Sequence, residues 1–107
     1  MQRKFDRKLE KLKKRLLKMS GLVEDAISVS IKALEEKKAN LAEKVMKSDD
    51  KINLLEVEID DLCLKLLALF QPQASDLRFI TSTMKINNDL ERMGDLAVNI
   101  EIGRAHV

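Results

Sequence analysis

The fold is decided by the stretch Gln71-Pro72-Gln73-Ala74-Ser75, which holds the only proline of the chain. Proline has no N–H to donate within a helix, and its ring disfavours helical geometry at the preceding residue. A helix that approaches this stretch is therefore expected to end near residue 70, and another to begin near residue 75. Because a short link places two long helices side by side in opposite directions, the stretch predicts an antiparallel hairpin.

Apolar residues recur along the chain in steps of mostly three and four residues, which is the spacing of a buried helical seam. The first series consists of Phe5, Leu9, Leu12, Leu16, Met19, Val23, Ala26 and Leu34. The second consists of Leu41, Val45, Ser48, Ile52, Leu55, Ile59, Leu62, Leu66 and Leu69, and the third of Phe79, Thr83, Ile86, Leu90, Met93, Ala97 and Ile100. These series predict helices at about residues 3–36, 40–70 and 75–101. The fold class is therefore all-α, an up-down-up antiparallel three-helix bundle forming one domain over residues 1–101.

The composition excludes several classes of function. Charged residues make up 36% of the 107 residues, and aromatic residues only 3%, with no Trp or Tyr. Base stacking on a single-stranded nucleic acid is therefore not expected, because it needs aromatic faces. No apolar run reaches the roughly 20 residues that span a bilayer. Cys63 is the only cysteine, so an internal disulfide is excluded. These features predict a cytoplasmic protein.

Catalytic motifs are missing from the sequence. The only histidine is His106, close to the C-terminal end, so no Ser–His–Asp set is available and Cys63 has no nearby histidine to activate it. Neither a Gly-rich phosphate loop nor an HExxH motif occurs. We expect a protein that is not an enzyme, with Cys63 as a small buried apolar residue.

Two pairs of oxygen-bearing side chains lie one helical turn apart in the predicted hairpin. Glu91 and Asp95 share a face of the third helix, and Asp49 and Asn53 share a face of the second. In a hairpin centred on Pro72, Asp49 lies level with Asp95, and Asn53 lies level with Glu91. The four side chains are therefore predicted to face each other in a shallow surface patch, and such oxygen-rich sets suit hard cations, iron or manganese.

Further acidic residues extend this patch. Glu24 on the first helix and Glu56 on the second are candidate additional metal ligands, and Asp60 continues the acidic face. The alternative is that these carboxylates form a solvated helix face. The chain would then be a metal-free structural helical bundle or coiled-coil adaptor.

Charge is distributed unevenly along the chain. Residues 1–18 carry nine basic and two acidic residues, a net charge of +7, whereas residues 19–107 carry a net charge of −5. The basic block is either a solvated helix end or a surface for an anionic partner, such as a membrane or a nucleic acid.

Several motifs resemble those of the PhoU family, the regulators that accompany the bacterial phosphate-specific transport system. They are residues 71–78, Leu90-Glu91-Arg92-Met93-Gly94-Asp95, Asn99-Ile100, Met19-Ser20-Gly21-Leu22-Val23-Glu24 and residues 49–60. The resemblance covers about residues 5–100. It implies that the chain corresponds to the N-terminal half only, the first of two repeated three-helix bundles.

The resemblance also implies a function. PhoU-like proteins repress phosphate-starvation genes by contacting the ATPase of the phosphate ABC transporter and the sensor histidine kinase of the phosphate regulon. Some members bind iron or zinc clusters through an acidic residue and an Asp four positions apart, which Glu91 and Asp95 match. Asp49 matches the facing motif, whereas Asn53 stands where an acid is often found. We expect a homo-oligomer such as a homodimer, no nucleic acid partner, and only indirect contact with a membrane.

The last six residues differ in character from the rest. The sequence Ile102-Gly103-Arg104-Ala105-His106-Val107 resembles the translation of a common DNA-sequencing adapter. We expect residues 102–107 to be a non-native tail.

Overall fold

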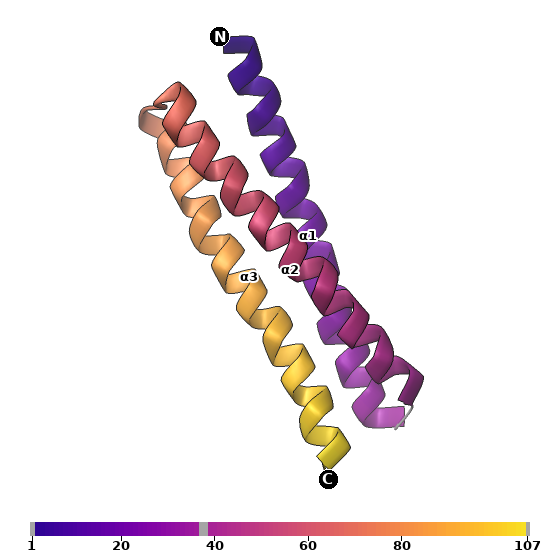
Figure 1. Ribbon diagram of the computed structural model, residues 1–107. Coiled ribbons are helices and arrows are strands. Elements are labelled where there is room, and N and C mark those ends of the chain that lie inside the picture. The colour runs from indigo at the N-terminus through magenta and orange to yellow at the C-terminus, as the bar shows by residue number, and fades with distance from the viewer. Residues whose placement is uncertain (1, 37–38, 107) are drawn as a thin grey trace.

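A computed structural model describes residues 2–36 and 39–106, with burial given for residues 3–36 and 40–103. It contains α1 (Gln2–Glu36), α2 (Ala39–Phe70) and α3 (Ala74–His106), and no strand occurs in these ranges. The helices pack side by side with alternating direction into a rod of 54 × 18 × 17 Å (Figure 1). This confirms the predicted all-α, up-down-up three-helix bundle. Within the described ranges, none of the helices combines the length and apolar character that crossing a membrane requires.

The helix boundaries follow the sequence pattern closely, with one exception. Each helix begins one residue before its expected start, and α1 and α2 end where expected. The α3 helix instead continues five residues beyond the expected end at residue 101. Residue 107 and the polar residues 37–38, part of the predicted link between the first two helices, lie outside the described residues.

The link between α2 and α3 forms as the proline predicts. The α2 helix ends at Phe70, and residues 71–73 are not helical. Gln71 and Ala74 have φ angles of 44° and 52°, and left-handed geometry of this kind is costly for residues with a Cβ. At this end of the rod the ring of Phe5 on α1 lies 5.3 Å from the ring of Phe70, in an edge-on arrangement. The N-terminal end of α1 is thereby packed against the end of α2 (Figure 1).

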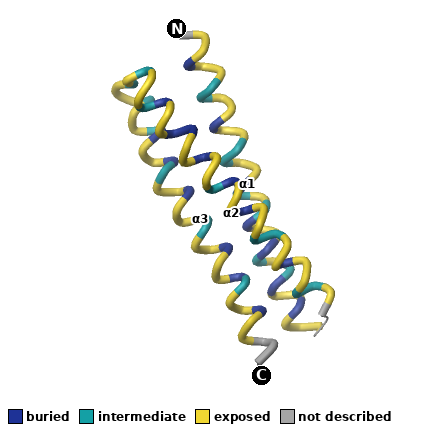
Figure 2. The backbone as a smooth tube through the Cα atoms, in the orientation of Figure 1, coloured by how far each residue is buried: buried dark blue, intermediate teal, exposed yellow. Residues whose placement is uncertain are grey.

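A continuous apolar core runs along the axis of the rod (Figure 2). Its largest fully buried apolar side chains are Leu12, Met19, Ile52, Ile59, Leu66 and Ile80. Burial of these side chains supplies most of the stability of the helices, because isolated amphipathic helices are marginal in water. Cys63 is part of this core, as expected.

The predicted seam of α3 coincides with the observed core face only in part: Thr83 and Ala97 are buried, and Phe79 and Leu90 pack against the core. Ile86 and Met93 are 44% and 43% exposed, whereas their neighbours Asn87 and Gly94 are buried. The same one-residue shift buries Ile80 and Glu101. The physical reason is that the α2-facing side of α3 carries small or polar residues, which an apolar pattern does not reveal. Leu34 and Leu69, the last members of the other two series, are also exposed.

Candidate functional site

Four carboxylates gather in the groove between α2 and α3. Asp49 and Glu56 come from α2, and Glu91 and Asp95 come from α3. Besides desolvation, the negative charge of Asp95 raises the pKa of both α2 carboxylates. The charges of Asp49, Glu56 and Asp95 in turn raise the pKa of Glu91. The hairpin thus brings Asp49 level with Asp95, as the register around Pro72 predicts. We call these four residues the acidic cluster.

The acidic cluster disfavours negative charge on Asp49, Glu56 and Glu91. Desolvation is the largest cause that raises the pKa of Glu91 to about 7, followed by a hydrogen bond with Asp95 and by the neighbouring negative charges. Desolvation and the charge of Asp95 also raise the pKa of Asp49, although a hydrogen bond from Asn53 opposes this shift. Burial and the charge of Asp60 raise the pKa of Glu56. A cation in the groove would therefore relieve repulsion.

Asn53 contacts the acidic cluster through a hydrogen bond to Asp49. Its Nδ2 donates a hydrogen bond to Oδ2 of Asp49 over 3.3 Å, as expected for side chains one turn apart. The other carboxylate oxygen of Asp49, Oδ1, is buried without a hydrogen-bond partner. A buried acceptor without a donor is costly, so this oxygen has an open position for a cation.

The acidic cluster fits an oxygen-preferring metal by its chemistry, but its side chains are not yet arranged around one point. Within the described ranges, no three His, Cys, Asp or Glu side chains stand so that they could hold one metal ion together. Coordination would therefore require side-chain rotation. Such rotation is feasible for half-buried groups at a helix surface, which is where Glu56 and Glu91 lie.

The role of Glu24 as an additional metal ligand stays a prediction. Glu24 is exposed on α1 and is not among the groups that raise the pKa of Glu91. In a three-helix bundle the groove between two helices lies opposite the third, so an α1 side chain reaches the α2–α3 groove only around the outside. Asp60 lies one helical turn after Glu56 on α2, and besides burial its negative charge raises the pKa of Glu56.

Asn87 is a site residue that sequence reasoning missed. Its side chain is 2% exposed, and its Nδ2 donates to the backbone carbonyl of Glu56 over 3.0 Å, which fixes the orientation of the amide. Its Oδ1 is buried without a hydrogen-bond partner. Asn87 lines a hollow of about 500 Å³ with Glu56, Asp60, Met84, Lys85 and Asn88. In the sequence, the only feature that indicates a place for Asn87 near the site is its position one helical turn before Glu91.

The sequence model of a protein family, described as the PhoU domain, matches residues 16–101 of this chain. This range includes every member of the acidic cluster. The chain belongs to the PhoU family. This PhoU chain is 48% identical over 97 residues to a protein of Aquifex aeolicus named "Phosphate-specific transport system accessory protein PhoU homolog". That alignment covers 91% of the PhoU chain and 44% of the Aquifex protein.

Further relatives agree in sequence and in structure. The Escherichia coli strain K12 protein named "Phosphate-specific transport system accessory protein PhoU" is 38% identical over 96 residues, which cover 90% of this PhoU chain and 40% of that protein. The crystal structure of PhoU from Pseudomonas aeruginosa superposes with a TM-score of 0.88 at 43% identity. It covers 91% of this PhoU chain and 46% of the Pseudomonas chain. The PhoU chain therefore spans less than half the length of these relatives.

Proposed function

We propose that this chain regulates phosphate uptake and phosphate-starvation signalling by binding other proteins. The observation that carries the proposal is its 48% identity to a protein named as a phosphate-specific transport system accessory protein. In this proposal its partners are the ATPase of the phosphate ABC transporter and the sensor histidine kinase of the phosphate regulon. Its role is that of a binding and regulatory module rather than an enzyme, acting as a homo-oligomer in the cytoplasm.

The proposal includes a metal cluster of iron or zinc at the surface of the bundle. Glu91, Asp95 and Asp49 would hold it, with the amide oxygen of Asn53 and the carboxylate of Glu56 as further ligands. Two observations support this assignment: the open Oδ1 of Asp49 and the mutual repulsion that raises the pKa of Glu91. When bound, the metal would supply positive charge that neutralises the groove and fixes its carboxylates in one arrangement.

The metal assignment is tested by measuring the metal content of the purified chain by mass spectrometry. We expect bound iron or zinc in the unmodified chain and its loss in the double variant Glu91→Gln/Asp95→Asn. A matched control is Glu43→Gln/Asp89→Asn, which removes two exposed carboxylates outside the acidic cluster. Equal metal content in the two double variants would exclude the acidic cluster as the site.

The regulatory role is tested separately from the metal. The chain is expressed in a bacterium that lacks its own PhoU protein and carries a phosphate-starvation reporter, and binding to the purified ATPase and kinase is measured. We expect repression of the reporter at high phosphate and binding to both partners. Absence of both effects would favour a structural helical adaptor instead, and the metal content measured above decides whether that adaptor is metal-free.

A further inference from the structure

One face of α1 concentrates most of the basic residues of the N-terminal block. At 100° per residue, eight of its nine basic residues fall within an arc of about 140° around the helix. They are Arg3, Lys4, Arg7, Lys8, Lys11, Lys14, Arg15 and Lys18. We call this arc the basic face. Over residues 3–18 it is about 22 Å long at 1.5 Å per residue.

Local contacts leave the basic face open to a partner. Six of its eight residues are exposed, and only Lys8 and Arg15 are half-buried. Arg15 is engaged, because its Nε lies 3.2 Å from Oε2 of Glu58 on α2. The ninth basic residue, Lys13, lies outside the arc, where it pairs with Glu10 at 3.4 Å and stands 5.5 Å from the centre of the Phe79 ring.

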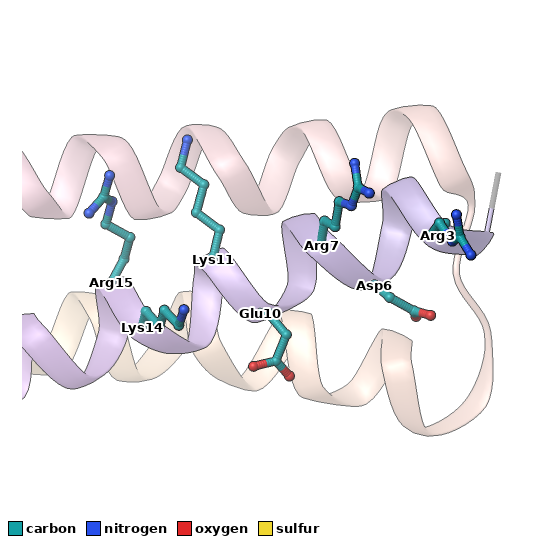
Figure 3. Close-up of a pocket in the computed structure, with 7 residues that line it drawn as sticks. All are labelled: Arg3, Asp6, Arg7, Glu10, Lys11, Lys14 and Arg15. Atoms are coloured by element: carbon teal, nitrogen blue, oxygen red, sulfur yellow. The ribbon is translucent and has the colours of Figure 1, made fainter.

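The acids of the N-terminal block lie off the basic face. In Figure 3, Arg7, Lys11 and Arg15 point toward α2, whereas Asp6 and Glu10 point to the other side of α1. A hollow of about 570 Å³ lies on this part of the helix, and five of its seven lining residues are basic. An adjoining hollow of about 280 Å³ in the α1–α2 groove adds Lys65 to the rim, and Glu58 and Asp61 of α2 also line it.

The basic face and the acidic cluster therefore lie on different sides of the bundle. The acidic cluster lies in the α2–α3 groove, which is opposite α1, and the basic face follows the N-terminal half of α1 up to its border with α2, where it meets Glu58 and Asp61. Such a charge separation turns the basic face, in a single orientation, toward any extended negatively charged surface.

We propose that the basic face of α1 binds the headgroups of anionic lipids and holds the rod flat against a membrane surface, with the acidic cluster turned away from it. Clusters of four to eight Lys and Arg on an amphipathic helix are the pattern that anionic lipid surfaces attract. Five of the eight side chains are lysines, whose strongly hydrated point charges suit diffuse attraction to many headgroups rather than a shaped phosphate pocket. This direct contact departs from the indirect membrane contact expected from the sequence, goes beyond the proposed regulatory role and needs no transporter.

Attachment is electrostatic and reversible, without insertion into the lipid. The apolar residues on the inner side of this half of α1, such as Phe5, Leu12 and Met19, are buried in the core of the bundle and are not available to a bilayer. Helices that insert into the interface need an apolar face of their own, in addition to basic residues. High salt is therefore expected to release the protein completely, because it screens the attraction.

The test is flotation of the full chain with phosphatidylglycerol-containing vesicles and with pure phosphatidylcholine vesicles. We expect binding to the anionic vesicles alone and its loss at high salt. The variant Lys11→Glu/Lys14→Glu/Lys18→Glu is expected to bind at least about 100-fold more weakly, since each basic residue near such a surface contributes about a factor of five. The matched control, Lys44→Glu/Lys47→Glu/Lys85→Glu, changes net charge equally at exposed positions outside the basic face and is expected to retain most of the binding.

Each remaining outcome overturns the proposal. Equal binding to both kinds of vesicle, or equal weakening in both triple variants, would show that the basic face is not the contact. Binding of inorganic tripolyphosphate or of a short DNA duplex without binding to anionic vesicles would assign the face to a free phosphoryl ligand or to nucleic acid. Circular dichroism checks helix content in each variant. If the triple Glu variant loses helix, the matching Lys→Gln variant at positions 11, 14 and 18 replaces it, with the same expected weakening.

Discussion

Gly94 on α3 packs directly against Ile52 on α2. A methyl group at position 94 would lie 3.3 Å from Cδ1 and 3.4 Å from Cγ2 of Ile52, so the two helices are as close here as an Ile side chain permits. Gly94 directly precedes Asp95, and Ile52 lies three residues after Asp49. This contact therefore sets the width of the groove at the acidic cluster.

The close approach at Gly94 predicts different effects of alanine at two helical glycines. Gly21→Ala is expected to stabilise the bundle by about 0.5–1 kcal/mol, because alanine favours a helix and no atom would lie within 4 Å of its methyl group. Gly94→Ala is expected to stabilise less or to destabilise, because Ile52 must move. Urea unfolding of both variants measures the difference.

A second substitution tests whether the contact with Ile52 causes the unfavourable effect of Gly94→Ala. In an Ile52→Val background, which removes Cδ1, Gly94→Ala is expected to be more favourable than in the unmodified chain by a few tenths of a kcal/mol or more. Gly21→Ala serves as the control, and its effect should be the same with and without the Ile52→Val substitution. Additive effects of the Gly94 and Ile52 substitutions would rule out the steric explanation.

The raised pKa of Glu91 predicts that stability depends on pH. Its pKa is about 7 in the folded chain against 4.5 ordinarily, so the folded state retains a proton that the unfolded state releases between these values. Stability from this group is therefore full below about pH 4.5 and is lost as the pH rises to about 7. In the presence of a chelator, Glu91→Gln is expected to be more stable than the unmodified chain at about pH 8, by at least a few tenths of a kcal/mol, with little difference at about pH 4.

Denaturant titrations at several pH values test this expectation. Glu43→Gln, which removes an exposed carboxylate outside the acidic cluster, is the control and should not flatten the profile. A Glu91→Gln variant that is less stable than the unmodified chain at high pH would show that the glutamate makes a favourable contact there instead.

Cys63 is expected to resist thiol reagents in the native chain. Burial, with a smaller contribution from the charge of Asp60, raises the pKa of the Cys63 thiol to about 11. At pH 8 only about one thiol in 1,000 is then ionised, and the thiolate is the reactive form. Labelling with a chromogenic disulfide reagent should be slow in buffer and fast in denaturant. Rapid stoichiometric labelling under native conditions would contradict burial of this side chain.

Left-handed backbone geometry at the start of α3 predicts a stabilising glycine. Ala74 is exposed and has a φ angle of 52°, where the Cβ is unfavourable, so Ala74→Gly is expected to stabilise the chain by up to about 1 kcal/mol. Ala68→Gly, at an exposed position inside α2, should instead destabilise it by about 0.5–1 kcal/mol. Thermal unfolding compares the two variants, and a loss of stability in both would mean that position 74 is not left-handed in solution.

Helix positions and register could be predicted from the sequence because each depends on a local signal. Pro72 fixes the end of α2, and with the link centred there, the pairing of Asp49 with Asp95 follows from counting residues. Burial of Cys63 could be predicted for the same reason, since it lies in an apolar stretch of α2.

Features that depend on two helices at once could not be predicted. The inward position of Asn87 is stabilised by a carbonyl of α2, and Gly94 is buried because Ile52 covers it. Neither residue is apolar, so an apolar pattern placed Ile86 and Met93 in the core instead.

The shortness of the connection between Phe70 and Ala74 has a consequence for natural and engineered length variants of this hairpin. One residue added to the first turn of α3, directly after this connection, would advance the rest of α3 by about 1.5 Å and turn it by about 100° relative to α2. Asp95 would then swing out of line with Asp49, while every helix could remain intact. Insertions in the first turn of α3 should thus uncouple the two halves of the acidic groove without unfolding the rod.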